Sequence, residues 1–147
     1  MELIHYGSSV YKEELFEDIK NENWVKPRGG LWSSPVDSKW GWKDWCEAEQ
    51  FRECDEENSF RFKLSSAKIA TIDNLKDLIY LPFQENGRYL DYETIALNYD
   101  AIYLTENGEK ETRYTTGWVN LYGWDCETVL VLNKRCINII PDFCKLK

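Results

Sequence analysis

Two carboxylates near the end of the chain, Asp125 and Glu127, come closest to a catalytic pair in type and spacing. Glu127 stands inside an otherwise apolar segment, residues 126–132, where a carboxylate is costly unless it is paired or used. On a strand, residues two apart point to the same face, roughly 6 to 7 Å apart along the backbone. Two acids placed in this way can stabilise a cationic sugar transition state or divide acid and base roles. The alternative, favoured by composition alone, is a solvated face on which both acids are simply wet.

His5, the single histidine, precedes Tyr6 and Gly7 at the end of a short apolar segment. Such a lone histidine is more often a core residue hydrogen-bonded to the backbone than a catalyst. The chain contains no GxSxG motif, no GxGxxG fingerprint and no P-loop, so hydrolytic triads and Rossmann-type binding are unsupported. The five cysteines form no CxxC pair and repeat no spacing, which predicts free buried thiols and no metal site.

The chain of 147 residues is acidic, with 26 Asp and Glu against 18 Lys and Arg and a formal charge of -8. Because phosphate binding requires a basic face, this balance disfavours a broad nucleic-acid footprint. The N-terminus lacks a basic region followed by an apolar run, and no stretch approaches the roughly 18 apolar residues of a membrane span. The sequence therefore predicts a cytoplasmic protein that does not enter the membrane. The absence of linkers and repeats predicts one domain, residues 1–147.

Short strands and short helices are expected to position these residues. Alternating or β-branched segments predict strands at 2–6, 31–34, 59–64, 68–72, 99–104, 126–132 and 136–140. Helices are expected at 11–20, from Asp37 or Ser38 through Cys46, from Asp73 or Asn74 to Leu81, and at 91–97. Asn107-Gly108 is the strongest hairpin signal. Without a regular alternation of strand and helix, the pattern predicts an α+β fold with a mixed, largely antiparallel sheet.

Three segments, taken in chain order, resemble the ADP-ribosyltransferase superfamily. They are His-Tyr-Gly-Ser at 5–8, Gly-Gly-Leu-Trp-Ser-Ser-Pro at 29–35 and Asp-Cys-Glu-Thr-Val-Leu-Val-Leu-Asn at 125–133. In that family NAD lies in a cleft between two small sheets, so the resemblance implies a split β-sheet core with peripheral helices. The likeness is to small toxin-like members, which implies the cytoplasm of a bacterial or phage-infected cell.

The resemblance also implies roles for the matching residues. Glu127 would hold the ribose 2′-hydroxyl of NAD and stabilise the oxocarbenium ion that forms as nicotinamide leaves, while Asp125 would orient the acceptor. His5 would hold the nicotinamide-side ribose, and the Gly7 backbone would bond the carboxamide. Trp32 or Tyr122 would supply the ring that stacks on nicotinamide. The other cofactor-binding positions are Tyr6, Gly30, Ser33 and Ser34.

Three functions are compatible with these expectations. The first is a mono-ADP-ribosyltransferase that cleaves the nicotinamide glycosidic bond of NAD and transfers ADP-ribose to an unidentified macromolecular acceptor. The second is a module of the same fold that binds a partner or nucleotide without turnover, through an aromatic-rich surface. The third is a glycan-directed hydrolase or lectin-like domain, with Asp125 and Glu127 as its acid pair and tryptophans as sugar platforms.

Overall fold

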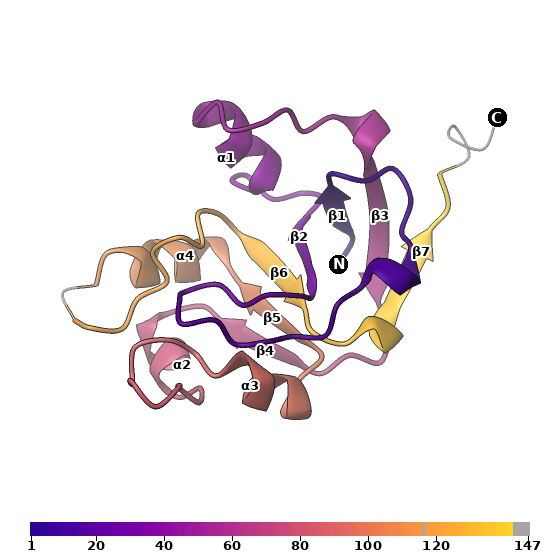
Figure 1. The fold of residues 1–147 in the computed structure, drawn as a ribbon. Coiled ribbons are helices and arrows are strands. Elements are labelled where there is room, and N and C mark those ends of the chain that lie inside the picture. Colours follow the sequence, from indigo (N-terminus) through magenta and orange to yellow (C-terminus); the bar gives the residue numbers. More distant parts are fainter. Residues whose placement is uncertain (116, 143–147) are drawn as a thin grey trace.

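The computed structural model describes residues 1–115 and 117–142. Within these residues, seven strands form a mixed sheet in the order β4-β5-β6-β2-β1-β3-β7 (Figure 1). The strands are β1 (Leu3–Tyr6), β2 (Leu31–Pro35), β3 (Ser59–Leu64), β4 (Ile69–Ile72), β5 (Ala101–Leu104), β6 (Thr128–Val131) and β7 (Ile137–Ile140). β4 and β5 are parallel, and every other neighbouring pair is antiparallel. The predicted α+β class with a mixed, largely antiparallel sheet is therefore confirmed.

Four α-helices accompany the sheet in the described part of the chain. They are α1 (Trp42–Ala48), α2 (Leu75–Ile79), α3 (Tyr92–Asn98) and α4 (Glu106–Arg113). α2 and α3 lie in the long connection that the parallel β4-β5 pair requires. Asn74 caps α2 and Asp91 caps α3, because each side chain accepts a hydrogen bond from a first-turn backbone N–H.

β2 connects two halves of the sheet because its two ends pair with different strands. Leu31 to Ser33 pair with β6, whereas Ser34 and Pro35 pair with β1. In Figure 1, β4, β5 and β6 lie on one side of β2, and β1, β3 and β7 lie on the other. The segments that carry the three motifs of the sequence therefore end on neighbouring strands.

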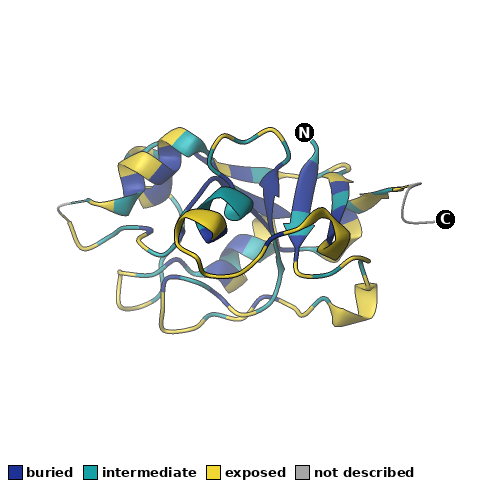
Figure 2. Cartoon of the chain, turned by 90° about the horizontal axis from the view of Figure 1, so that it is seen from above, coloured by how far each residue is buried: buried dark blue, intermediate teal, exposed yellow. Residues whose placement is uncertain are grey.

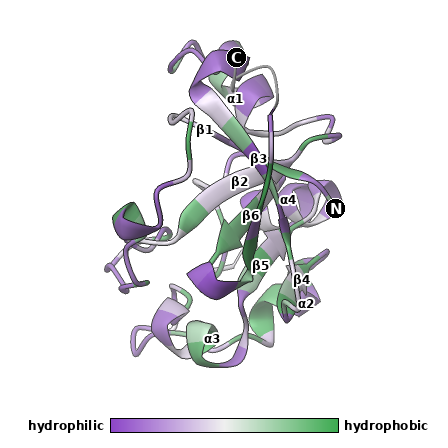
Figure 3. Ribbon diagram, turned by 90° about the vertical axis from the view of Figure 1, so that its right-hand side faces the viewer, coloured by the Kyte–Doolittle hydropathy of each residue, from purple (hydrophilic) through white to green (hydrophobic). Residues whose placement is uncertain are grey.

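Apolar side chains cover both faces of the sheet. On one face, Ile102 and Leu130 pack with side chains of α2 and α3 against the fully buried Trp124. On the other face, Phe62 and Val129 belong to a cluster that draws on both halves of the sheet. Figure 2 shows the central strands as largely buried, with exposed residues gathered in loops and outer helices, and Figure 3 shows hydrophobic residues concentrated on β5 and β6.

The helix expected at 11–20 is wrong. This segment contains a single 3-10 turn, Glu13–Leu15, and Leu15 is 70% exposed. Tyr11 and Phe16 instead pack against the sheet, and Lys20 forms a β-bridge with Arg28. The apolar residues thus do not form one face of a helix. They belong to an irregular loop that follows the sheet surface.

The hairpin expected at Asn107-Gly108 is also wrong, because both residues lie inside α4. Thr105 caps this helix by accepting a hydrogen bond from the Gly108 N–H. A Cβ on Gly108 would lie 2.0 Å from the carbonyl oxygen of Ile72. Gly108 therefore permits the close approach of α4 to β4 and does not form a turn.

Cys46, Cys54, Cys126 and Cys136 are free and buried, as predicted. Cys144 lies outside the described residues. No helix in the ranges 1–115 and 117–142 is both long and apolar enough to cross a membrane.

Candidate functional site

His5, Ser33 and Glu127 lie on the neighbouring strands β1 and β2 and at the start of β6. The His5 ring centroid lies 5.1 Å from that of Phe60, and the Glu127 carboxylate accepts a hydrogen bond from the Tyr103 hydroxyl. Phe60 and Tyr103 belong to the same apolar cluster on the sheet. The side chains of His5 and Glu127 therefore emerge on one face, across two strand spacings of roughly 5 Å each.

Glu127 is buried and held from three directions. Its carboxylate oxygen Oε2 accepts a hydrogen bond of 2.5 Å from the Tyr103 hydroxyl, and its side chain is only slightly accessible, with the residue 9% exposed. Its backbone N–H donates to the Trp40 carbonyl at 2.9 Å. The Ser34 hydroxyl donates to the Glu127 carbonyl at 2.8 Å. These contacts fix the position of the carboxylate before any ligand arrives.

The charges around Glu127 are mostly negative. Burial raises the pKa of Glu127, the Tyr103 hydrogen bond lowers it, and the nearby acids Glu106 and Asp37 raise it. Burial and the hydrogen bond to Glu127 also raise the pKa of Tyr103, which remains a hydroxyl donor at neutral pH. A cation placed beside this carboxylate would relieve both the desolvation and the repulsion.

The His5 ring is tied to the backbone of β2. Its Nδ1 lies 2.6 Å from the Trp32 carbonyl oxygen. Because a carbonyl can only accept, Nδ1 carries the proton. Burial lowers the pKa of His5, the hydrogen bond to Trp32 raises it in part, and the charge of Arg52 lowers it, so that the pKa lies below its ordinary value. The neutral ring therefore keeps a lone pair on Nε2, which would lie 3.9 Å from a Cβ built on Gly7. The reading of His5 as a backbone-bonded histidine is confirmed.

Tyr6 and Gly7 have structural contacts of their own. Tyr6 points to the opposite side of the sheet from His5, where it packs near Cys46, and burial raises the pKa of Tyr6 to about 12. Gly7 has a φ of 119° and its N–H donates to the Asn58 carbonyl at 2.8 Å. A carboxamide contact at Gly7 would therefore fall on its carbonyl oxygen.

Ser33 and Ser34 are buried and use their hydroxyls to hold β6. Ser33 Oγ donates to the Val129 carbonyl at 2.8 Å, and Ser34 Oγ donates to the Glu127 carbonyl. Ser34 Oγ also accepts a hydrogen bond of 3.0 Å from the Trp42 N–H at the start of α1. Both hydroxyls position the strand that carries Glu127.

Strand alternation does not relate Asp125 to Glu127, because the strand expected from residue 126 begins later. β6 begins at Thr128, so both acids precede the regular strand. Asp125 Oδ1 lies 3.0 Å from Nη1 of Arg113, which also contacts Glu109 at 3.5 Å. Asp125 thus belongs to an ion-pair network at the end of α4, whereas Glu127 is bonded to Tyr103. The two carboxylates therefore have different partners, and their role as the acid pair of a glycan hydrolase stays a prediction.

The two rings considered for stacking lie in different places. Trp32 belongs to the apolar cluster on the face opposite Val129, and its ring centroid is 4.9 Å from that of Trp124. Lys26 places its ammonium 5.6 Å from the Trp32 ring centroid. Tyr122 lies in an exposed turn beyond the sheet. Neither ring shares the face on which His5 and Glu127 emerge.

Gly30 has a packing role. Its φ is 74°, and a Cβ at this position would lie 2.7 Å from the Val131 carbonyl oxygen. Glycine is required here because a side chain would separate β2 from β6.

Sequence reasoning missed Tyr103, the residue that holds the Glu127 carboxylate. Alternation along β5 could have placed Tyr103 on the same face as Ala101, but pairing it with Glu127 requires the strand order. No group of three or more His, Cys, Asp or Glu residues in the described ranges is arranged to hold a metal ion.

A search of protein-family models, curated proteins and solved structures finds no match for this chain. What the site can do is therefore inferred from its own residues. It combines a fixed, buried carboxylate in an acidic environment with a neutral imidazole on the same face of the sheet.

Proposed function

We propose that this protein is a mono-ADP-ribosyltransferase-like enzyme of the corresponding fold, which cleaves NAD and transfers ADP-ribose to a macromolecular acceptor. Glu127 is the catalytic residue in this proposal. The observation that supports it most is the fixed, buried Glu127 carboxylate two strands from His5, on the same face of the sheet. Ser34 connects the second motif directly to the third by its bond to the Glu127 carbonyl.

The proposed chemistry begins with loss of nicotinamide. The bond from ribose C1′ to the nicotinamide nitrogen breaks, and its electron pair leaves with the now neutral nicotinamide. Positive charge develops on the ribose, where a preorganised carboxylate contributes roughly 3 to 4 kcal/mol of stabilisation. The acceptor nucleophile then bonds to C1′ and gives its proton to solvent water. The Tyr103 hydroxyl supports this step because its bond favours the ionised form of Glu127 against the effect of burial.

His5 and its neighbours would receive the nicotinamide end of NAD. The free Nε2 of His5 can accept a hydrogen bond from a ribose hydroxyl, since Nδ1 already donates to Trp32. The Arg52 guanidinium would lie 3.6 Å from a Cβ on Gly7, which makes it the cation best placed for the pyrophosphate. Because the Gly7 N–H already donates to Asn58, the Gly7 carbonyl oxygen would accept a hydrogen bond from the carboxamide of NAD.

The test is nicotinamide release from NAD by wild-type protein and by Glu127→Gln. The amide keeps the size of the side chain and can still accept from Tyr103, so the fold should survive. Release should fall by at least about 100-fold, in line with the loss of one transition-state stabiliser. Glu106→Gln is the matched control, since it removes a nearby acid that forms its own pair with Lys110. Unchanged release by the Glu127 variant would exclude the mechanism, and NAD binding without release by wild-type protein would favour a binding module.

A further inference from the structure

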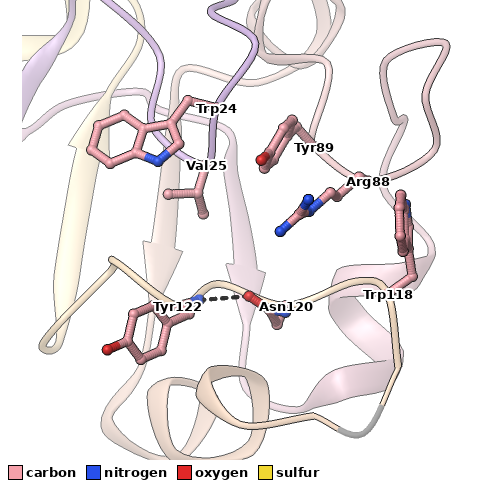
Figure 4. A pocket seen from close by; sticks show the side chains of 7 residues that line it. All are labelled: Trp24, Val25, Arg88, Tyr89, Trp118, Asn120 and Tyr122. Carbon is pink, nitrogen blue, oxygen red and sulfur yellow. Dashed lines mark hydrogen bonds between the residues drawn. The ribbon is translucent and has the colours of Figure 1, made fainter.

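Three loops that are distant in the sequence meet around an aromatic hollow at the surface (Figure 4). Its volume is about 130 Å³. Two of its rings are largely accessible, with Trp24 56% and Trp118 64% exposed. The hollow is lined by Trp24, Val25, Arg88, Tyr89, Trp118, Asn120 and Tyr122. Exposed tryptophans gathered around one hollow mark a binding surface more often than scattered ones do.

Hydrogen bonds hold the base of the hollow. The Val25 carbonyl accepts hydrogen bonds from two buried side chains, the Tyr92 hydroxyl at 2.5 Å and the Trp124 indole N–H at 3.1 Å. Asn86 donates to the Asn23 side chain at 3.1 Å, which ties the loop of Arg88 to the loop of Trp24. The loops that carry Trp24 and Arg88 are therefore joined without a ligand, and a ligand would lose little free energy to ordering their backbone.

Arg88 supplies the charge of the hollow. Its guanidinium carbon lies 5.2 Å from the ring centroids of both Tyr89 and Trp118. Figure 4 shows the guanidinium directed into the space between these rings and Asn120. No acidic side chain lines the hollow, and within the described residues Arg88 forms no ion pair. This arrangement disfavours a cation and suits a flat ligand that carries negative charge.

We infer that the hollow binds one nucleotide unit, with its base stacked on the exposed rings and its phosphate at Arg88. The volume suits a single ring system, because it is far below the roughly 300 Å³ at which drug-sized pockets begin. Asn120 accepts from the Tyr122 N–H at 3.1 Å, which leaves its amide N–H groups to read acceptor atoms on a base. The net charge of -8 disfavours a long phosphate track, so we expect recognition at one unit. This site is separate from the proposed NAD site and does not depend on it.

The test is a tryptophan-fluorescence titration with nucleoside monophosphates. AMP, GMP, CMP or UMP should quench the emission, whereas ribose 5-phosphate should bind at least about 5-fold more weakly because it lacks the stacked base. A short single-stranded oligonucleotide distinguishes a nucleic acid from a free nucleotide as the source of the bound unit. Tighter binding of the oligonucleotide would identify nucleic acid as the ligand, and equal binding would identify a free nucleotide.

Two variants and two controls locate the binding. Trp118→Ala should weaken nucleotide binding by about 5- to 100-fold, the range for loss of one stacked base. Arg88→Gln should remove the preference for a nucleotide over its nucleoside. Tyr80→Ala changes an exposed ring that does not line the hollow, and Glu127→Gln changes the proposed NAD site, so both should bind as wild type does. The inference is overturned if no nucleotide binds, if Trp118→Ala binds normally, or if a neutral oligosaccharide such as maltotriose binds more tightly.

Discussion

Replacing Tyr103 with phenylalanine removes one oxygen and thereby the hydroxyl that donates to Glu127. A hydrogen bond to a charged group contributes about 1.5 to 3 kcal/mol. Because Glu127 is still 9% exposed, water can partly replace the lost donor. We therefore expect the free energy of unfolding to fall by the lower part of this range, about 1.5 to 2 kcal/mol. This is a change of roughly 10- to 30-fold in the folding equilibrium at pH 8.

The loss should depend on pH with a definite sign. The Tyr103 bond lowers the pKa of Glu127, so the phenylalanine variant raises that pKa further. At pH 8 the carboxylate is charged and loses its donor. At pH 4 the carboxyl is mostly protonated in both proteins, so the difference should shrink to the value of a neutral bond, about 0.5 to 1.5 kcal/mol. The acid side of the pH profile for NAD cleavage should also move to higher pH in the variant, because the pKa of Glu127 is higher there.

The assay is urea unfolding of wild type, Tyr103→Phe, Glu127→Gln and the double variant at pH 4 and pH 8. The double-mutant cycle isolates the interaction between the two side chains. A coupling that is larger at pH 8 supports the charged bond. A Tyr103→Phe cost that is the same at both pH values and unchanged in the Glu127→Gln background would refute this reasoning.

Further predictions concern the supports of the site. Arg113→Gln should lower the free energy of unfolding by about 1 to 2 kcal/mol at pH 7, since its ion pair with Asp125 is only 19% and 13% exposed; urea titration at pH 7 checks it. Gly30→Ala should cost about 1 to 3 kcal/mol, measured as a lower Tm, because its Cβ would meet the Val131 carbonyl at a φ of 74°. His5 has a lowered pKa, so stability should be complete above its ordinary value of 6.5 and fall as the pH drops toward the folded-state pKa; His5→Gln should lack this part of the pH dependence of the urea midpoint.

The sequence predicts elements best where local chemistry decides. Phe60 and Phe62 alternate with polar residues and mark β3, and Asn74 caps α2 at the expected position. The prediction failed at 11–20, where spacing suggested a helix but the side chains pack one by one onto a sheet that local sequence does not reveal. It failed at Gly108 because contact with Ile72, distant in the chain, explains that glycine.

The same division holds for the site. The cost of a buried carboxylate pointed to Glu127, and a lone histidine such as His5 was expected to be bonded to the backbone more often than to be a catalyst. The bonds from Tyr103 to Glu127 and from Arg113 to Asp125 join different elements, so they depend on strand order and on the placement of α4. The hollow around Trp118 was missed for a similar reason, since its rings come from three separate loops.

The shared pairing of β2 has a consequence for how the molecule opens. Within the described chain, β2 is hydrogen-bonded both to the half that contains β5 and to the half that contains β3. Neither half can detach without losing its ladder to this short strand. β3 and β5, on opposite sides of the molecule, should therefore open as one cooperative unit. Deuterium exchange should give their slowly exchanging backbone amides the same free energy of opening.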